Sequence, residues 1–140
     1  MRITAVLLLV FTTACADSAE ETVPGRWYTA EQVKAGAPLY QSWCAQCHAA
    51  DGSATADWRT PDANGNYPPP PLNGSAHTWH HPMEVLTGTI AEGGAAFGGV
   101  MPGFGHVLDE ADRLAIVAWI QSLWSDDIYR RWEDIDNRSR

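Results

Sequence analysis

Apolar residues recur at helical spacing in the first third of the chain, with polar residues between them. The members of this series are Val33, Gly36, Tyr40, Trp43 and Cys44. Thr29 and Gln32 precede them with the spacing of a capping box, so the pattern predicts a helix that begins just after Thr29. Pro38 lacks an amide donor within this helix, and we expect a kink or a loosened turn there.

A second series of apolar positions comprises Met83, Leu86 and Ile90. Pro82 stands before it, and the pair Gly93-Gly94 stands after it. Proline is favoured at the start of a helix and glycine just beyond its end. This stretch therefore predicts a short helix from Pro82 to about Glu92.

The strongest helical pattern follows Asp109, a residue type that favours the N-cap position. Two apolar stripes run along it, one of Leu114, Val117, Ala118 and Gln121 and one of Ile116, Trp119, Ile120 and Leu123. Such breadth predicts burial on more than one side. Helical spacing continues through Ile128, Trp132 and Ile135, so the charged tail 126–140 is either a short extra helix or an extension past Ser125.

Between the first two helices, residues 49–75 carry turn and polyproline signals and few apolar anchors. The signals are Asp51-Gly52, Pro61, Asn64-Gly65 and the run Pro68 to Pro71. A loop of this length inside a small domain usually serves a site. The pattern as a whole predicts three to five helices and one long Pro-rich loop, in a domain that spans residues 28–125.

The N-terminus reads as an export signal over residues 1–15. Arg2 is followed by an apolar run from Ile3 to Phe11, which is about half of the ~20 residues needed to cross a bilayer. Thr12-Thr13-Ala14-Cys15 resembles a bacterial lipoprotein box, in which Cys15 would be lipidated; the alternative is cleavage after Ala16. Lipidation predicts a periplasmic protein that is anchored to the membrane by its lipid, and cleavage after Ala16 predicts a soluble periplasmic protein. Residues 16–27 lack apolar periodicity and are predicted to form a flexible tether.

The net charge of the chain narrows the classes of macromolecule that it could bind. The chain has 17 acidic and 9 basic residues, for a formal net charge of -8. A surplus of negative charge excludes nucleic acid as a natural partner, because phosphates are negative as well. We expect instead a redox protein partner with a basic docking patch.

The chemistry centres on Cys44-Ala45-Gln46-Cys47-His48. This CxxCH spacing is the attachment signal for c-type haem, in which Cys44 and Cys47 bond to the porphyrin edge and His48 binds the iron. Two other interpretations are open. One is a redox-active dithiol, although no strand precedes it. The other is a zinc site completed by His77, His80 or His81.

The second axial ligand decides between a closed and an open iron. A thioether closes the site and raises the reduction potential, whereas a vacant position admits small molecules. Met83 has the helical spacing of a core residue, and Met101 lies between glycines and Pro102, where the chain could approach a haem face closely. The competing ligands are His77, His80, His81 and His106.

The order of these features resembles the class I c-type cytochromes. The likeness covers about Tyr28 to Trp124 and rests on CxxCH together with Met101-Pro102 downstream. It implies an all-α fold in which the first and last helices cross near Gly36 and Trp119. It also implies thioether bonds at Cys44 and Cys47, with His48 and Met101 as axial ligands. The proline run, the segment from His77 to Pro82 and the tail beyond Ser125 depart from the family pattern.

The function that this resemblance implies is a monohaem electron carrier with one covalently attached haem c. It would pass single electrons between respiratory redox partners in the periplasm and would not be an enzyme. Two alternative functions belong to other classes. One is a haem-bearing subunit of a membrane oxidase or dehydrogenase. The other is a sensor or peroxidase that binds small ligands at an open iron.

Overall fold

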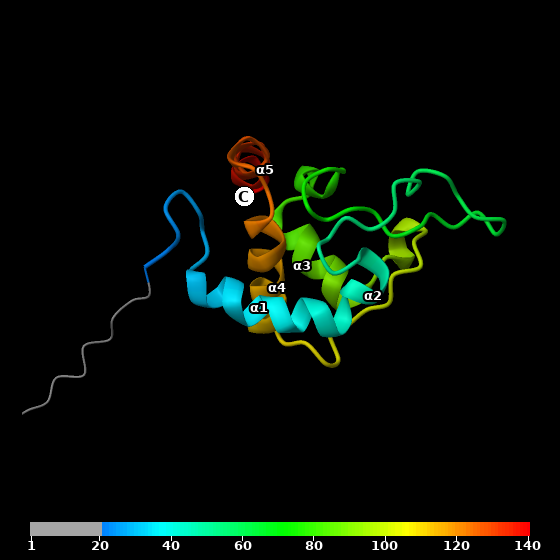
Figure 1. Ribbon diagram of the computed structural model, residues 1–140, viewed down its shortest axis with the longest axis horizontal. Coiled ribbons are helices and arrows are strands. Elements are labelled where there is room, and N and C mark those ends of the chain that lie inside the picture. The colour runs from blue at the N-terminus through cyan, green and yellow to red at the C-terminus, as the bar shows by residue number, and fades with distance from the viewer. Residues whose placement is uncertain (1–20) are drawn as a thin grey trace, which may run out of the picture.

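The structure, a computed structural model, describes residues 21–140 and contains five α-helices. They are α1 (Ala30–Trp43), α2 (Ala45–His48), α3 (Met83–Glu92), α4 (Glu110–Ser122) and α5 (Asp126–Ser139), with short 3-10 helices η1 (Thr78–His80) and η2 (Ala95–Phe97) (Figure 1). Within these residues the extended pairing is limited to an isolated bridge between Thr22 and Thr29. The predicted all-α fold is confirmed.

Both long helices that the sequence predicts begin where their capping residues stand. The Thr29 hydroxyl accepts the Gln32 amide at 3.1 Å, and the Gln32 side chain accepts the Thr29 amide at 2.9 Å. Asp109 and Asp112 form the same reciprocal pair at the start of α4. α1 continues through Pro38 without interruption, so the missing amide donor does not end the helix.

The centre of the fold is the crossing of α1 and α4, which Figure 1 shows lying against each other. Gly36 makes the crossing close, because a Cβ atom placed there would lie 1.9 Å from the Ala115 carbonyl oxygen. The crossing implied near Gly36 and Trp119 is therefore present, and Gly36 itself lies against Ala115. Trp119 lies one turn further along and packs on the Tyr40 ring, with 4.0 Å between centroids.

α4 is buried on several sides, as its two apolar stripes predicted. The residues that are almost inaccessible to solvent are Ala115, Ile116, Val117, Ala118, Ile120 and Gln121. Ile116, Val117, Ala118 and Ile120 form one hydrophobic core with residues from α1, α3 and α5. The helix that crosses α1 is α4. It is not the last helix of the domain, because α5 follows it in the chain.

α5 is a separate helix, and Ser125 caps its start. This decides between the two alternatives for residues 126–140. Tyr129 and Trp132 are buried in the core, and the Trp132 indole nitrogen donates to the His81 carbonyl at 3.1 Å. The buried carboxylate of Asp136 accepts the Met83 amide at 2.7 Å, which joins α5 to the start of α3.

The N-terminal segment of the described chain also contacts α5 and α4. Arg26 forms an ion pair with Asp126, and the Trp27 indole donates to Gln121 at 2.6 Å. The last residues of the predicted tether 16–27 are therefore held in place. The predicted export signal, Cys15 and the beginning of that tether lie outside the described residues. No helix within residues 21–140 has the length and apolar character that crossing a bilayer requires.

Candidate haem site

The CxxCH motif lies where α1 ends and α2 begins. The Cys44 amide donates to the Tyr40 carbonyl at 2.8 Å, and the Cys44 carbonyl accepts the amides of Cys47 at 3.1 Å and His48 at 2.9 Å. Cys44 is buried and Cys47 is exposed, and both thiols are free. The helical turn thus presents two unpaired sulfurs directly before a histidine.

The environment of Cys44 does not suit a redox-active dithiol. Burial, with a smaller contribution from the neighbouring Cys47, raises the pKa of the Cys44 thiol to about 11. A reactive thiol needs a lowered pKa, because the thiolate is the nucleophile. Among residues 21–140, no group of three or more His, Cys, Asp or Glu side chains is arranged to hold a metal ion. His77, His80 and His81 therefore do not join the two cysteines in such a group.

Tyr40 fixes the chain immediately after the motif. Its side chain is fully buried, and its hydroxyl donates to the Ala49 carbonyl at 2.9 Å. Ala49 has a positive φ of 62°, where a residue other than glycine is uncommon. The ring of Tyr40 also packs on Trp119, so this one side chain connects the end of α2 to α4.

The imidazole of His48 has a defined orientation. Its Nδ1 atom lies 2.8 Å from the Pro70 carbonyl, and a carbonyl can only accept, so Nδ1 carries the proton. Burial lowers the pKa of His48, while the bond to Pro70 opposes that shift. The neutral ring then keeps a lone pair on Nε2, which has no protein hydrogen-bond partner among the described residues. This is the state that an iron ligand requires.

The proline run holds the Pro70 carbonyl in position. The Thr78 hydroxyl donates to the Pro71 carbonyl at 3.1 Å, and the Leu72 amide donates to Gly52 at 2.7 Å. The Trp124 indole then donates to the Leu72 carbonyl at 2.7 Å. The run, whose role the sequence left undetermined, is thus a strap that sets the tautomer of His48.

Met101 lies on a segment that is tied to the end of α3. Its carbonyl accepts the Gly94 amide at 2.9 Å, and the Phe104 amide donates to Ile90 at 2.8 Å. Gly93, at a φ of +86°, makes this approach possible, since a Cβ there would lie 2.6 Å from the Met101 carbonyl oxygen. The Met101 side chain is half-buried and packs against the core.

Aromatic contact brings the Met101 segment beside the motif. Trp43, directly before Cys44, contacts Phe104, three residues after Met101, with 6.0 Å between ring centroids. Met83, the competing methionine, is half-buried at the start of α3, where its amide is bonded to Asp136 of α5. The Trp43–Phe104 contact therefore places the segment after Met101 beside the end of α1, while both methionines pack against the core that contains Cys44.

Large apolar side chains are exposed on both segments of the site. Trp43 is 41% exposed, Phe97 is 79% exposed and Val100, directly before Met101, is 61% exposed. Exposed apolar surface of this kind marks a place where another apolar group binds. A flat apolar macrocycle held between the motif and Met101 is the kind of group that such side chains can cover.

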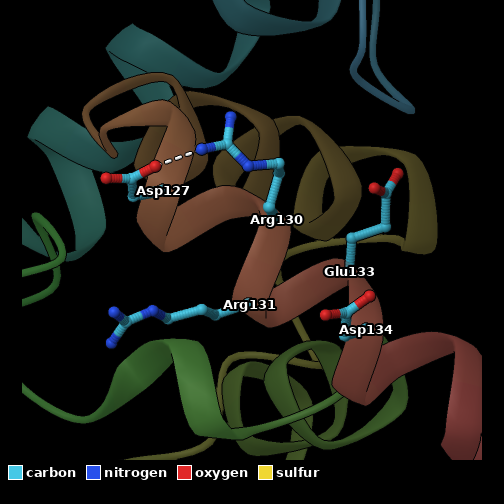
Figure 2. Close-up of a pocket in the computed structure, with 5 residues that line it drawn as sticks. All are labelled: Asp127, Arg130, Arg131, Glu133 and Asp134. Carbon is cyan, nitrogen blue, oxygen red and sulfur yellow. Dashed lines mark hydrogen bonds and ion pairs between the residues drawn. The ribbon is translucent and has the colours of Figure 1, made fainter.

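The remaining histidines lie elsewhere. His77, His80 and His81 gather around η1, and His106 is exposed in the turn after Phe104. Two surface depressions contain none of the predicted site residues. One is bordered only by charged residues of α5, shown in Figure 2: Asp127, Arg130, Arg131, Glu133 and Asp134.

A family model described as "Cytochrome C oxidase, cbb3-type, subunit III" matches residues 31–120, which is more than half of the chain. The protein belongs to this family of c-type cytochrome domains. No curated protein and no solved structure gives a significant match to the chain.

The family implies haem c as the cofactor, and the residues present fit it. They supply two free thiols at the CxxCH spacing, an imidazole with a free Nε2 and a thioether on a neighbouring segment. Sequence reasoning named these four side chains but missed the Pro70 carbonyl and the Tyr40 hydroxyl. The strap was visible as a proline run, and nothing in the sequence marked Tyr40 as more than an apolar helix position.

Proposed function

We propose that the protein is a monohaem c-type cytochrome that carries single electrons between respiratory redox partners in the periplasm. Cys44 and Cys47 would hold the one haem covalently, and His48 and Met101 would bind its iron. The observation that carries the proposal is the hydrogen bond from His48 Nδ1 to the Pro70 carbonyl, which leaves Nε2 for the iron. The haem supplies one-electron chemistry when bound.

The chain's own residues have three tasks in this proposal. The strap fixes His48, because the Pro70 carbonyl accepts its Nδ1 proton. Tyr40 and the α1–α4 crossing hold the motif rigidly, which limits structural change between oxidation states. The Met101 segment, anchored at Gly94 and Ile90, would hold the thioether for the iron and would keep small molecules away from it. None of these tasks needs a general base or a nucleophile.

Covalent attachment is tested by extraction with acidified solvent. We expect denatured wild-type protein to keep its haem, because thioether bonds survive unfolding. Cys44→Ala and Cys47→Ala should each weaken retention, and the double variant should abolish it. Cys15→Ser is the matched control and should retain the haem fully, since this third cysteine lies outside the motif. Complete extraction from the wild type would refute covalent attachment.

The family description favours a second candidate function, a haem-bearing subunit of a membrane oxidase. Cell fractionation with Cys15→Ser distinguishes it from the mobile carrier. If a lipid on Cys15 is the anchor, labelled fatty acid should enter the wild type only, and the variant should become soluble in the periplasm. A variant that remains on the membrane within a larger complex would favour the oxidase subunit. Lipid-free mature wild type that begins at Asp17 would establish soluble periplasmic release by cleavage after Ala16.

A further inference from the structure

Two tryptophan indoles donate hydrogen bonds to the chain that follows the strap, Pro68 to Pro71. The Trp124 indole nitrogen donates to the Leu72 carbonyl at 2.7 Å, directly after the strap. The Trp132 indole nitrogen donates to the His81 carbonyl at 3.1 Å, at the end of η1. Both side chains are buried, with 4% and 2% of their surface exposed, and their ring centroids lie 6.3 Å apart. The two donors therefore belong to one buried aromatic pair.

The chain around the strap also packs closely on the corner between α4 and α5. A Cβ atom at Gly74 would lie 3.2 Å from Trp124 Cδ1 and 3.4 Å from Ile128 Cγ2. A Cβ atom at Gly52 would lie 3.3 Å from the Leu123 side chain. The lack of a side chain at these two glycines allows the chain to lie directly against the corner that carries Trp124.

The Leu72 carbonyl is two residues from the carbonyl that orients His48. The Pro70 carbonyl accepts the Nδ1 proton of His48 at 2.8 Å. The proline rings fix φ at residues 70 and 71, so backbone rotation there cannot absorb a displacement of Leu72. A change in the bond between Trp124 and Leu72 should therefore reach the Pro70 carbonyl.

The bond from Trp132 reaches the same strap through η1. The His81 amide donates to the Thr78 carbonyl at 3.3 Å, and the Thr78 hydroxyl donates to the Pro71 carbonyl at 3.1 Å. Figure 1 shows α5 beside η1, where this contact is made. Each indole thus supports the strap by its own set of hydrogen bonds.

Both indoles lie beyond the residues that the family model matches, which end at position 120. Trp124 stands between α4 and α5, and Trp132 lies within α5. The structure that supports His48 therefore includes a part of the chain that the family match does not cover.

We propose that Trp124 and Trp132 are positioning residues for His48, and that their indole donors tune its electron donation to the iron through the strap. The inference rests on the proposed function, since it requires a haem iron bound to His48. A hydrogen bond from Nδ1 to a carbonyl makes Nε2 a stronger electron donor, which favours oxidised iron. A loosened strap weakens that bond and raises the midpoint potential.

The test has two readouts on the purified holoprotein: the midpoint potential, from spectroelectrochemistry, and the exchange rate of the His48 Nδ1 proton, from NMR of the reduced protein. Trp124→Phe keeps a buried aromatic ring and removes the indole donor. We expect a higher potential and exchange about fivefold faster, the factor that corresponds to about 1 kcal/mol, the usual net contribution of one hydrogen bond. Trp132→Phe should shift both readouts in the same direction by less, because it acts through η1.

Two further variants complete the experiment. Trp27→Phe is the matched control, because the Trp27 indole donates to Gln121 at 2.6 Å and not to the chain around the strap. It should reduce stability and leave the potential and the exchange rate unchanged. Thr78→Val removes the hydroxyl that holds Pro71 and should shift both readouts as Trp124→Phe does.

The outcomes separate the inference from the proposed function. A higher potential with faster exchange in the Trp124 and Trp132 variants supports the inference. An unchanged potential in both variants, with haem attached, would overturn it whatever the exchange rate. An equal shift in Trp27→Phe would also overturn it, because the potential would then follow stability and not the strap. Trp132→Phe decides if Trp124→Phe does not fold. Wild type with no attached haem would overturn the proposed function itself, which absorption spectra show before any potential is measured.

Discussion

Replacing Met101 with alanine is expected to open the iron to carbon monoxide and cyanide while the haem stays attached. In the proposed cytochrome the thioether bonds are made by Cys44 and Cys47 and would not depend on Met101, whereas the sixth coordination position would. The midpoint potential should fall, because a thioether favours the reduced state and a water ligand does not. Absorption spectra in the presence of carbon monoxide, together with voltammetry, measure both effects.

Met83→Ala is the matched control for that experiment. Met83 is half-buried at the start of α3, so its loss should reduce stability by at most about 2 kcal/mol, the lower end for a core methionine. The spectrum should not change. If the two variants exchanged these outcomes, Met83 would be the ligand and the carrier function would stand. Wild type that binds carbon monoxide as fast as Met101→Ala would favour the sensor or peroxidase alternative.

Gly36→Ala is expected to destabilise the fold strongly. The added Cβ would lie 1.9 Å from the carbonyl oxygen and 2.5 Å from the carbonyl carbon of Ala115, both of them backbone atoms that cannot rotate away. α1 and α4 would have to separate, and overpacking of this kind costs about 1–3 kcal/mol or more. Denaturant unfolding of the holoprotein, followed by circular dichroism, measures the loss.

Gly88→Ala is the same chemical change, but we expect it to stabilise the fold. Gly88 lies inside α3, and a Cβ there would meet nothing within 4 Å. Alanine should stabilise this helix by about 0.5–1 kcal/mol, because glycine has more backbone freedom to lose on folding. Equal effects of the two substitutions would mean that the Gly36–Ala115 contact is not close in solution.

Local signals in the sequence predicted the local structure well. Thr29 and Asp109 both cap helices, because a side-chain oxygen that satisfies nearby amides acts within four residues. Pro82 and Gly93 likewise stand at the N-cap and C-cap positions of α3. The chemistry of the CxxCH motif is equally local, since its spacing alone brings the two thiols and His48 onto adjacent turns.

Long-range contacts could not be predicted in the same way. The sequence did not identify Ala115 as the residue against which Gly36 lies, because the register of two crossing helices depends on the shapes of both. The acceptor for His48 is a backbone carbonyl, which every residue has, so no residue type identifies Pro70. The burial of Trp132 in the charged tail depends on α3 and η1, which are distant in sequence.

The burial of Cys44 has a consequence for the order in which the protein is assembled. Cys44 shares its buried cluster with Ile116 and Ile120 of α4, which are synthesised much later than the motif. Until α4 has emerged and docked, the sulfur has no core to enter and remains accessible to a modifying enzyme. If haem is attached as proposed, chemistry at this thiol would compete in time with closure of the helices, and a chain that folded too early would hide one of its two proposed attachment points.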